Sequence, residues 1–94
     1  MEVDQFTPDQ LSRLERWLQR HPELDGLEAL LLERLEAATG AGREQLDSGR
    51  LSRTLGVAHA LVRRSASSLE SRGLIEVTSR RGAGPGLWLS LTPG

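Results

Sequence analysis

Residues 50–77, RLSRTLGVAHALVRRSASSLESRGLIEV, decide the fold because they place a short helix, a glycine turn, a longer helix and a strand in direct succession. Leu51 and Leu55 lie four residues apart on one helical face, and Gly56 is suited to end that helix. A longer helix follows over residues 58–72. Its buried stripe is expected at helical spacing, at Val62, Ala66 and Leu69. The stretch therefore predicts two helices joined by a tight turn and followed by a strand.

Two more helices are predicted upstream, each beginning at a capping box. Thr7 with Gln10, and Asp25 with Glu28, have the spacing at which two side chains satisfy the first free backbone N–H groups of a helix. These boxes predict helices over 7–20 and 26–39. The apolar stripe of the second helix is the most hydrophobic segment and the expected centre of the core, and it comprises Leu27, Leu30, Leu31, Leu35 and Ala38.

The remaining segments favour β structure. Residues 74–78 and 87–92 alternate in polarity like the strands of a hairpin, and the loop SRRGAGPG at 79–86 has the glycines that a chain reversal needs. Residues 43–46 allow a brief extended piece, and Ser48 is the expected N-cap of the helix that ends at Leu55. The predicted class is α+β, mostly helical, with one domain over 1–94.

Charge divides the chain into two halves. Residues 1–47 hold five arginines and eleven acids, whereas residues 48–94 hold seven arginines and two acids. The net charges are −6 and +5, although the whole chain carries only −1. Such asymmetry favours a basic face that meets a polyanion, and the alternative is two solvated faces that attract each other within one domain.

Composition argues against several other classes. The chain has no cysteine, no apolar run of membrane-spanning length and no basic, apolar leader, so we expect a cytoplasmic protein without disulfides. Its two histidines, His21 and His59, are too far apart for a metal site of usual spacing. Carboxylates such as Glu33 and Glu36 are expected on outward, solvated helix faces. We therefore predict no catalysis, no metal and no cofactor.

Three motifs carry a family resemblance. They are L-x-x-x-L-G-V at 51–57, L-E-x-x-G-L-I at 69–75 and L-T-P-G at 91–94. In this order and spacing the chain resembles the winged helix-turn-helix domain of bacterial transcription regulators, most closely the multiple-antibiotic-resistance-regulator (MarR) type. The resemblance covers residues 24–94. It implies that 58–72 is a recognition helix, that 75–92 is a wing, and that 7–20 is an extra N-terminal helix.

The resemblance also implies a set of double-stranded DNA contacts. The recognition helix would offer His59, Ala60, Arg63, Arg64 and Ser67 to the major groove. Arg63 or Arg64 would read guanine or grip a phosphate, and Arg50 and Arg53 would contact backbone phosphates from the bracing helix. Arg80 and Arg81 would bring the wing to the minor groove or its phosphates. Ala58 stands where the family commonly has a capping Ser or Thr, and Arg80-Arg81 where its wing often has an Asp-Arg pair.

Two questions remain open at the level of sequence. The apolar face of the first helix, Leu11, Leu14, Trp17 and Leu18, serves either a homodimer or packing on the second helix. Trp88 either stacks on a base or covers apolar surface of the protein or a partner. The alternative function is a protein-protein interaction module in a complex that replicates, repairs or segregates DNA, because fold does not fix function.

Overall fold

The computed structural model describes residues 6–79 and 86–93, and within these ranges the chain forms four helices and three strands. In chain order they are α1 (Pro8–Arg20), α2 (Gly26–Gly40), β1 (Leu46–Asp47), α3 (Ser48–Leu55), α4 (His59–Ser71), β2 (Ile75–Ser79) and β3 (Leu87–Leu91). The predicted α+β, mostly helical class and its order of elements are confirmed. No helix within the described ranges is long and apolar enough to cross a membrane.

Both predicted capping boxes are formed. The Thr7 hydroxyl accepts the Gln10 backbone N–H at 3.2 Å, and the Gln10 side chain accepts the Thr7 N–H at 2.8 Å. Asp25 and Glu28 make the same reciprocal pair at 2.7 and 2.9 Å. These side chains fix the starts of α1 and α2 because they satisfy N–H groups that have no partner inside the helix.

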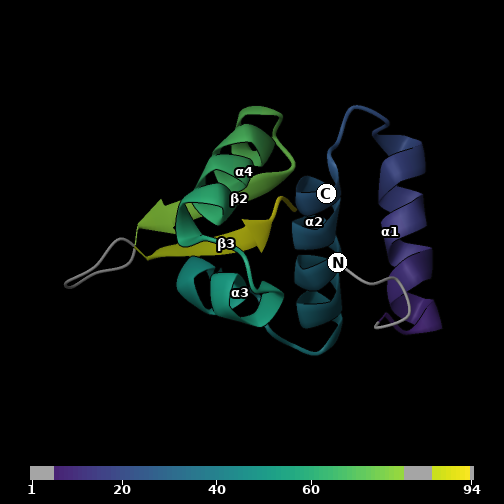
Figure 1. The fold of residues 1–94 in the computed structure, drawn as a ribbon, viewed down its shortest axis with the longest axis horizontal. Helices are drawn as coiled ribbons and strands as arrows, with labels where there is room; N and C mark the ends of the chain where they lie inside the picture. The colour runs from purple at the N-terminus through teal and green to yellow at the C-terminus, as the bar shows by residue number, and fades with distance from the viewer. Residues whose placement is uncertain (1–5, 80–85, 94) are drawn as a thin grey trace.

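The core is centred on α2, which other elements surround. Figure 1 shows α1 on one side of α2, and α3, α4 and the sheet on the other. The buried side chains of α2 therefore point in several directions, and they include Ala29, Leu30, Leu31, Leu32 and Leu35. The stripe expected from periodicity is only partly buried, since Leu27 and Ala38 are half-buried.

Glu33 corrects one prediction from the sequence. The outward, solvated position expected for its carboxylate is wrong, because its relative exposure is 0%. Arg13 of α1 and Arg34 of α2 both bind the carboxylate, so α1 covers the face of α2 that the sequence pattern assigns to solvent. A buried carboxylate is tolerable in such a place because it is paired with cations.

The sheet is antiparallel, with the order β1-β3-β2. Its two longer strands pair from Ile75 opposite Leu91 to Ser79 opposite Leu87. Leu46 of β1 pairs with Leu89 on the other side of β3. Leu89 and Ile75 are buried, and they join Val62, Ala66 and Leu69 of α4 in one apolar cluster. The hairpin is thereby anchored to the inner face of α4.

Candidate nucleic-acid interface

The turn between α3 and α4 is held by local hydrogen bonds. The Ser52 hydroxyl donates to the Val57 carbonyl at 2.7 Å, and the Val57 N–H donates to the Ser52 carbonyl at 3.1 Å. Gly56 ends α3 with a φ of 67°, a left-handed conformation that glycine adopts with little strain. The sequence prediction that Gly56 ends this helix is confirmed.

The start of α3 differs from the expectation. Asp47, rather than Ser48, is the N-cap, and its carboxylate accepts the Gly49 N–H at 3.0 Å. Ser48 is the first helical residue and its relative exposure is 0%. Its hydroxyl accepts the N–H of Leu87, the first residue of β3, at 2.9 Å. Ser48 therefore connects α3 to the hairpin instead of capping its own helix.

The outer surface of α4 is a mixture of small, apolar and cationic side chains. Ala60, Arg64 and Ser67 recur at helical spacing and are exposed, and Arg63 is exposed beside them. The inward positions at Val62, Ala66 and Leu69 are buried, as periodicity predicts. Ala58 precedes the helix as its N-cap without any side-chain hydrogen bond, as expected for alanine.

His59 does not lie as freely as the sequence suggests. It is half-buried, and its Nε2 atom lies 2.8 Å from the Ser48 hydroxyl oxygen. Neither sequence-based alternative, a solvent-facing histidine or a base reader, anticipates this contact. The bond directs the imidazole toward the start of α3. The first turn of α4 therefore presents few side-chain hydrogen-bonding groups to a ligand.

Four arginines on α3 and α4 are exposed and unneutralised. Arg50, Arg53, Arg63 and Arg64 make no ion pair within the described part of the chain. Between Ser48 and Leu69 the sequence contains no Asp or Glu. Both helices of this unit therefore carry positive charge, and the single acid on them is Glu70 in the last turn of α4.

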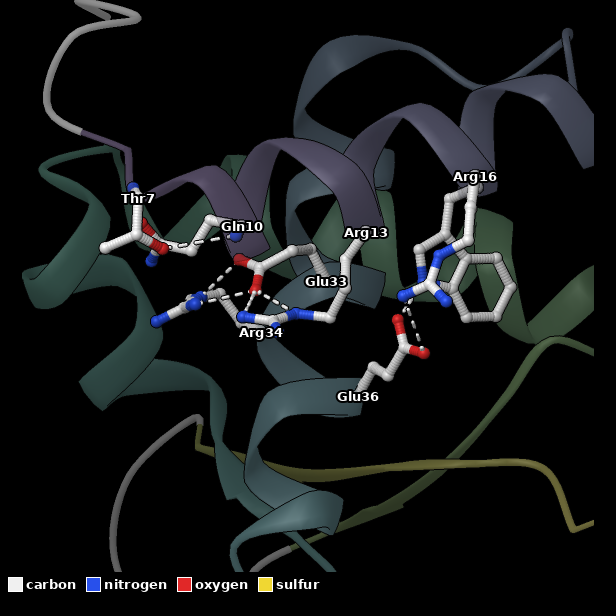
Figure 2. A network of polar contacts seen from close by, with 8 residues as sticks. Thr7, Gln10, Arg13, Arg16, Glu33, Arg34 and Glu36 are labelled. Atoms are coloured by element: carbon white, nitrogen blue, oxygen red, sulfur yellow. Dashed lines mark hydrogen bonds and ion pairs between the residues drawn. The ribbon is translucent and has the colours of Figure 1, made fainter.

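Three arginines of α1 and α2 have carboxylate partners, whereas Arg20 lies over the Trp17 ring. Arg13 and Arg34 converge on Glu33 with N···O distances of 2.6 to 2.9 Å, and Figure 2 shows both guanidinium groups around this carboxylate. Arg16 lies 3.7 Å from Glu36 on the same face. Acids of the first half of the chain therefore neutralise Arg13, Arg16 and Arg34. Within the described residues these acids make no ion pair with Arg50, Arg53, Arg63 or Arg64.

Arg72, at the end of α4, belongs to this paired group. Its guanidinium lies 3.5 Å from Glu28, which is 5% exposed. Burial raises the pKa of Glu28, but the Asp25 backbone N–H, the Ser68 hydroxyl and the Arg72 charge outweigh this effect and hold the pKa below its ordinary value of 4.5. The C-terminal end of α4 is thus attached to α2, while its N-terminal end carries the open arginines.

The predicted wing is only partly described. Arg80 and Arg81 lie outside the described residues, so their assignment to DNA stays a prediction. The hairpin is described up to Ser79 on β2 and from Leu87 on β3. Trp88 is 36% exposed on β3, opposite Asp47 on one side and Thr78 on the other. Both sequence-based roles of Trp88 stay predictions.

The apolar face of α1 is turned mainly toward α2. Leu11, Leu14 and Trp17 are half-buried, whereas Leu18 is 39% exposed. Trp17 packs against the core, and its Nε1–H donates to Glu36 at 3.1 Å. These contacts correspond to the packing alternative, and a homodimer through α1 stays a prediction.

Comparison of the sequence with protein-family models and with curated proteins gives no match. Within residues 6–79 and 86–93, no three His, Asp or Glu side chains gather in a way that would hold a metal ion.

Proposed function

We propose that this protein binds double-stranded DNA as a winged helix-turn-helix transcriptional regulator. In this proposal α3 braces against the DNA backbone, α4 lies in the major groove and the β2–β3 hairpin is the wing. The order α2-β1-α3-α4-β2-β3 supports it, because a short helix, a tight turn, a longer helix and a hairpin follow one another on one core.

The observation that carries the proposal is the contrast between two groups of arginines. Arg13, Arg16 and Arg34 on α1 and α2 have carboxylate partners, whereas Arg50, Arg53, Arg63 and Arg64 are exposed and make no ion pair in the described structure. Unneutralised guanidinium groups on a segment without acids from Ser48 to Leu69 suit a ligand that brings its own regularly spaced negative charge. Duplex DNA is such a ligand, and arginine binds phosphate bidentately.

Base readout within this proposal falls mainly on Arg63 and Arg64. His59 is engaged by Ser48, and Ala58 and Ala60 have no side-chain donor or acceptor. Each arginine fits the O6 and N7 atoms of guanine or a phosphate oxygen. Arg50 and Arg53 are assigned to phosphates, which orient the protein but carry no sequence information. The expected recognition is therefore short and guanine-centred, with a large sequence-independent part.

The salt dependence of duplex binding tests the proposal. The two phosphate contacts of Arg50 and Arg53 predict a slope of about −1.8 for log Kobs against log salt, or roughly a tenfold loss between about 50 and 200 mM salt. Fluorescence anisotropy with labelled duplexes would measure it. Arg53→Ala should weaken binding and flatten the slope by about one, since one phosphate contact is lost.

A matched control uses the same change of charge on the other side of the protein. Arg16→Ala removes an exposed arginine that is paired with Glu36, and it should leave the slope as in the wild type. A flat salt response, or no duplex binding at low salt, would disprove the proposal.

One observation favours the alternative, a winged-helix module that binds another protein in a DNA replication, repair or segregation complex. Leu61 is 46% exposed on α4, next to the exposed Ala60. An apolar protein contact there would depend little on salt. Leu61→Ser would then abolish partner binding, whereas Arg63→Ala and Arg64→Ala would have little effect.

A further inference from the structure

A single buried hydroxyl joins three elements of the proposed interface. Ser48 is at the start of α3, His59 at the start of α4 and Leu87 at the start of β3. The Ser48 oxygen lies 2.8 Å from His59 Nε2 and accepts the Leu87 N–H at 2.9 Å. The relative exposure of Ser48 is 0%, so water does not take the place of His59 or Leu87 beside its hydroxyl group.

The register of the sheet explains why the hydroxyl occupies this position. Leu46 pairs with Leu89 and Asp47 with Trp88, so the next antiparallel step would place residue 48 opposite Leu87. The chain instead turns into α3 at Ser48. The serine side chain then accepts the N–H that a longer β1 would have bound with a backbone carbonyl. The β1–β3 ladder is extended by one side chain, and His59 shares that side chain.

The contact lies where the geometry of a wing would be determined. Leu87 pairs with Ser79 at the described end of the hairpin, opposite the end formed by Ile75 and Leu91. His59 lies in the first turn of α4, one turn before Arg63. A change at Ser48 therefore acts on the spacing between the hairpin and the N-terminal end of α4.

We infer that Ser48 and His59 are positioning residues for DNA binding, which fix the hairpin relative to the first turn of α4 so that both meet the same duplex. This inference rests on the proposed function. Neither residue needs to touch DNA, and the effect of each passes through the other. His59 is thereby reassigned from base reader to support.

The first test compares two serine variants of the same helix. Ser48→Ala removes the hydroxyl shared by α4 and β3, and Ser52→Ala removes a hydroxyl that bonds only within the α3–α4 turn, to the Val57 carbonyl. Amide hydrogen exchange by NMR would report the protection of Leu87 relative to Leu89 in each variant. We expect Ser48→Ala to raise Leu87 exchange about tenfold over Leu89, and Ser52→Ala to leave the ratio unchanged.

The second test is duplex affinity at low salt, measured on variants that far-UV circular dichroism shows to be folded. We expect Ser48→Ala to lower duplex affinity about tenfold, because a displaced hairpin or α4 would lose about one charge-assisted contact to DNA. Ser52→Ala should lower the affinity much less. His59→Ala keeps the Ser48–Leu87 bond and is the substitute if Ser48→Ala does not fold. It should lower affinity without changing Leu87 exchange.

A double-mutant cycle separates positioning from direct contact. If both residues act through their mutual bond, the double variant Ser48→Ala/His59→Ala should bind DNA as tightly as the single variant that has the lower affinity. Additive losses would show that His59 contacts DNA by itself and would overturn the inference. Unchanged affinity in Ser48→Ala, despite faster Leu87 exchange, would overturn it as well. In both cases wild-type duplex binding would leave the proposed function standing, whereas absence of wild-type binding would remove both.

Discussion

Glu33 gives the strongest prediction about stability. Its carboxylate is fully buried and accepts three hydrogen bonds, from Arg34 Nε at 2.6 Å, from an Arg34 terminal nitrogen at 2.7 Å and from Arg13 Nε at 2.9 Å. Glu33→Gln keeps the shape of the side chain but removes its charge and turns an amide NH₂ group toward a guanidinium. The variant therefore leaves two cations beside each other without their shared anion.

The magnitude follows from the exposure of the three side chains. Removing one partner of a buried ion pair costs about 3–5 kcal/mol when the remaining charge stays buried. Here the side chains of Arg13 and Arg34 keep 22% and 26% of their exposure, so each unpaired cation reaches water in part. We expect Glu33→Gln to lower the free energy of unfolding by about 2–3 kcal/mol, which is below that range because both cations keep part of their hydration.

Urea unfolding, followed by tryptophan fluorescence and circular dichroism, would measure the loss. The matched control is Glu36→Gln on the same helix, where the carboxylate is 38% exposed and its partner Arg16 is 3.7 Å away. A surface pair of this kind contributes less than about 1 kcal/mol, and glutamine still accepts the Trp17 N–H. Equal effects of the two substitutions, or a Glu33→Gln loss below about 0.5 kcal/mol, would refute the view of Glu33 as a buried ionic centre.

Three further predictions follow from other described contacts. The lowered pKa of Glu28 means that its stabilising effect is present above the ordinary value of 4.5 and is lost as pH falls through the folded-state value. Glu28→Gln should therefore be less stable than wild type at pH 7, with a difference that shrinks in acid melts, and a difference independent of pH would contradict this. Gly56→Ala should cost about 1–2 kcal/mol because an L-residue is strained at a φ of 67°, whereas Gly26→Ala, where an added Cβ meets nothing within 4 Å, should change thermal stability little. In selection from random duplexes, Arg64→Ala should lose about 1–3 kcal/mol chiefly at one guanine position, and Arg50→Ala should lose affinity evenly on all sequences. An even loss in Arg64→Ala would assign it to phosphate.

Local signals in the sequence predict the elements well. The capping boxes at Thr7 and Asp25 place the starts of α1 and α2 within a residue, and Gly56 marks the end of α3. Each of these signals acts through side chains or backbone angles within about one helical turn. The spacing that buries Val62, Ala66 and Leu69 is equally local, and it orients the arginines of α4 outward.

Contacts between distant segments are not visible in the same way. The helical pattern of α2 gives no sign that α1 covers Glu33, because Arg13 lies twenty residues away in the chain. Ser48 resembles an N-cap on composition alone, yet its partner Leu87 is thirty-nine residues away. His59 is drawn inward by the same hydroxyl. The sequence therefore indicates which helices carry the candidate site, while the tertiary structure determines which polar side chains are available there.

The way α1 is attached also divides the protein into two levels of local stability. No residue of α1 is buried, and its contacts to α2 are made by half-buried side chains such as Leu14 and Trp17 and by a few ion pairs. Residues of α2 such as Leu31 and Leu32 lie instead in the centre of the core. Amide protons of α1 should then exchange through an opening of that helix alone, and those of α2 only through global unfolding. Among the four described helices, α1 is the one that a protease would reach first, with the other three still folded.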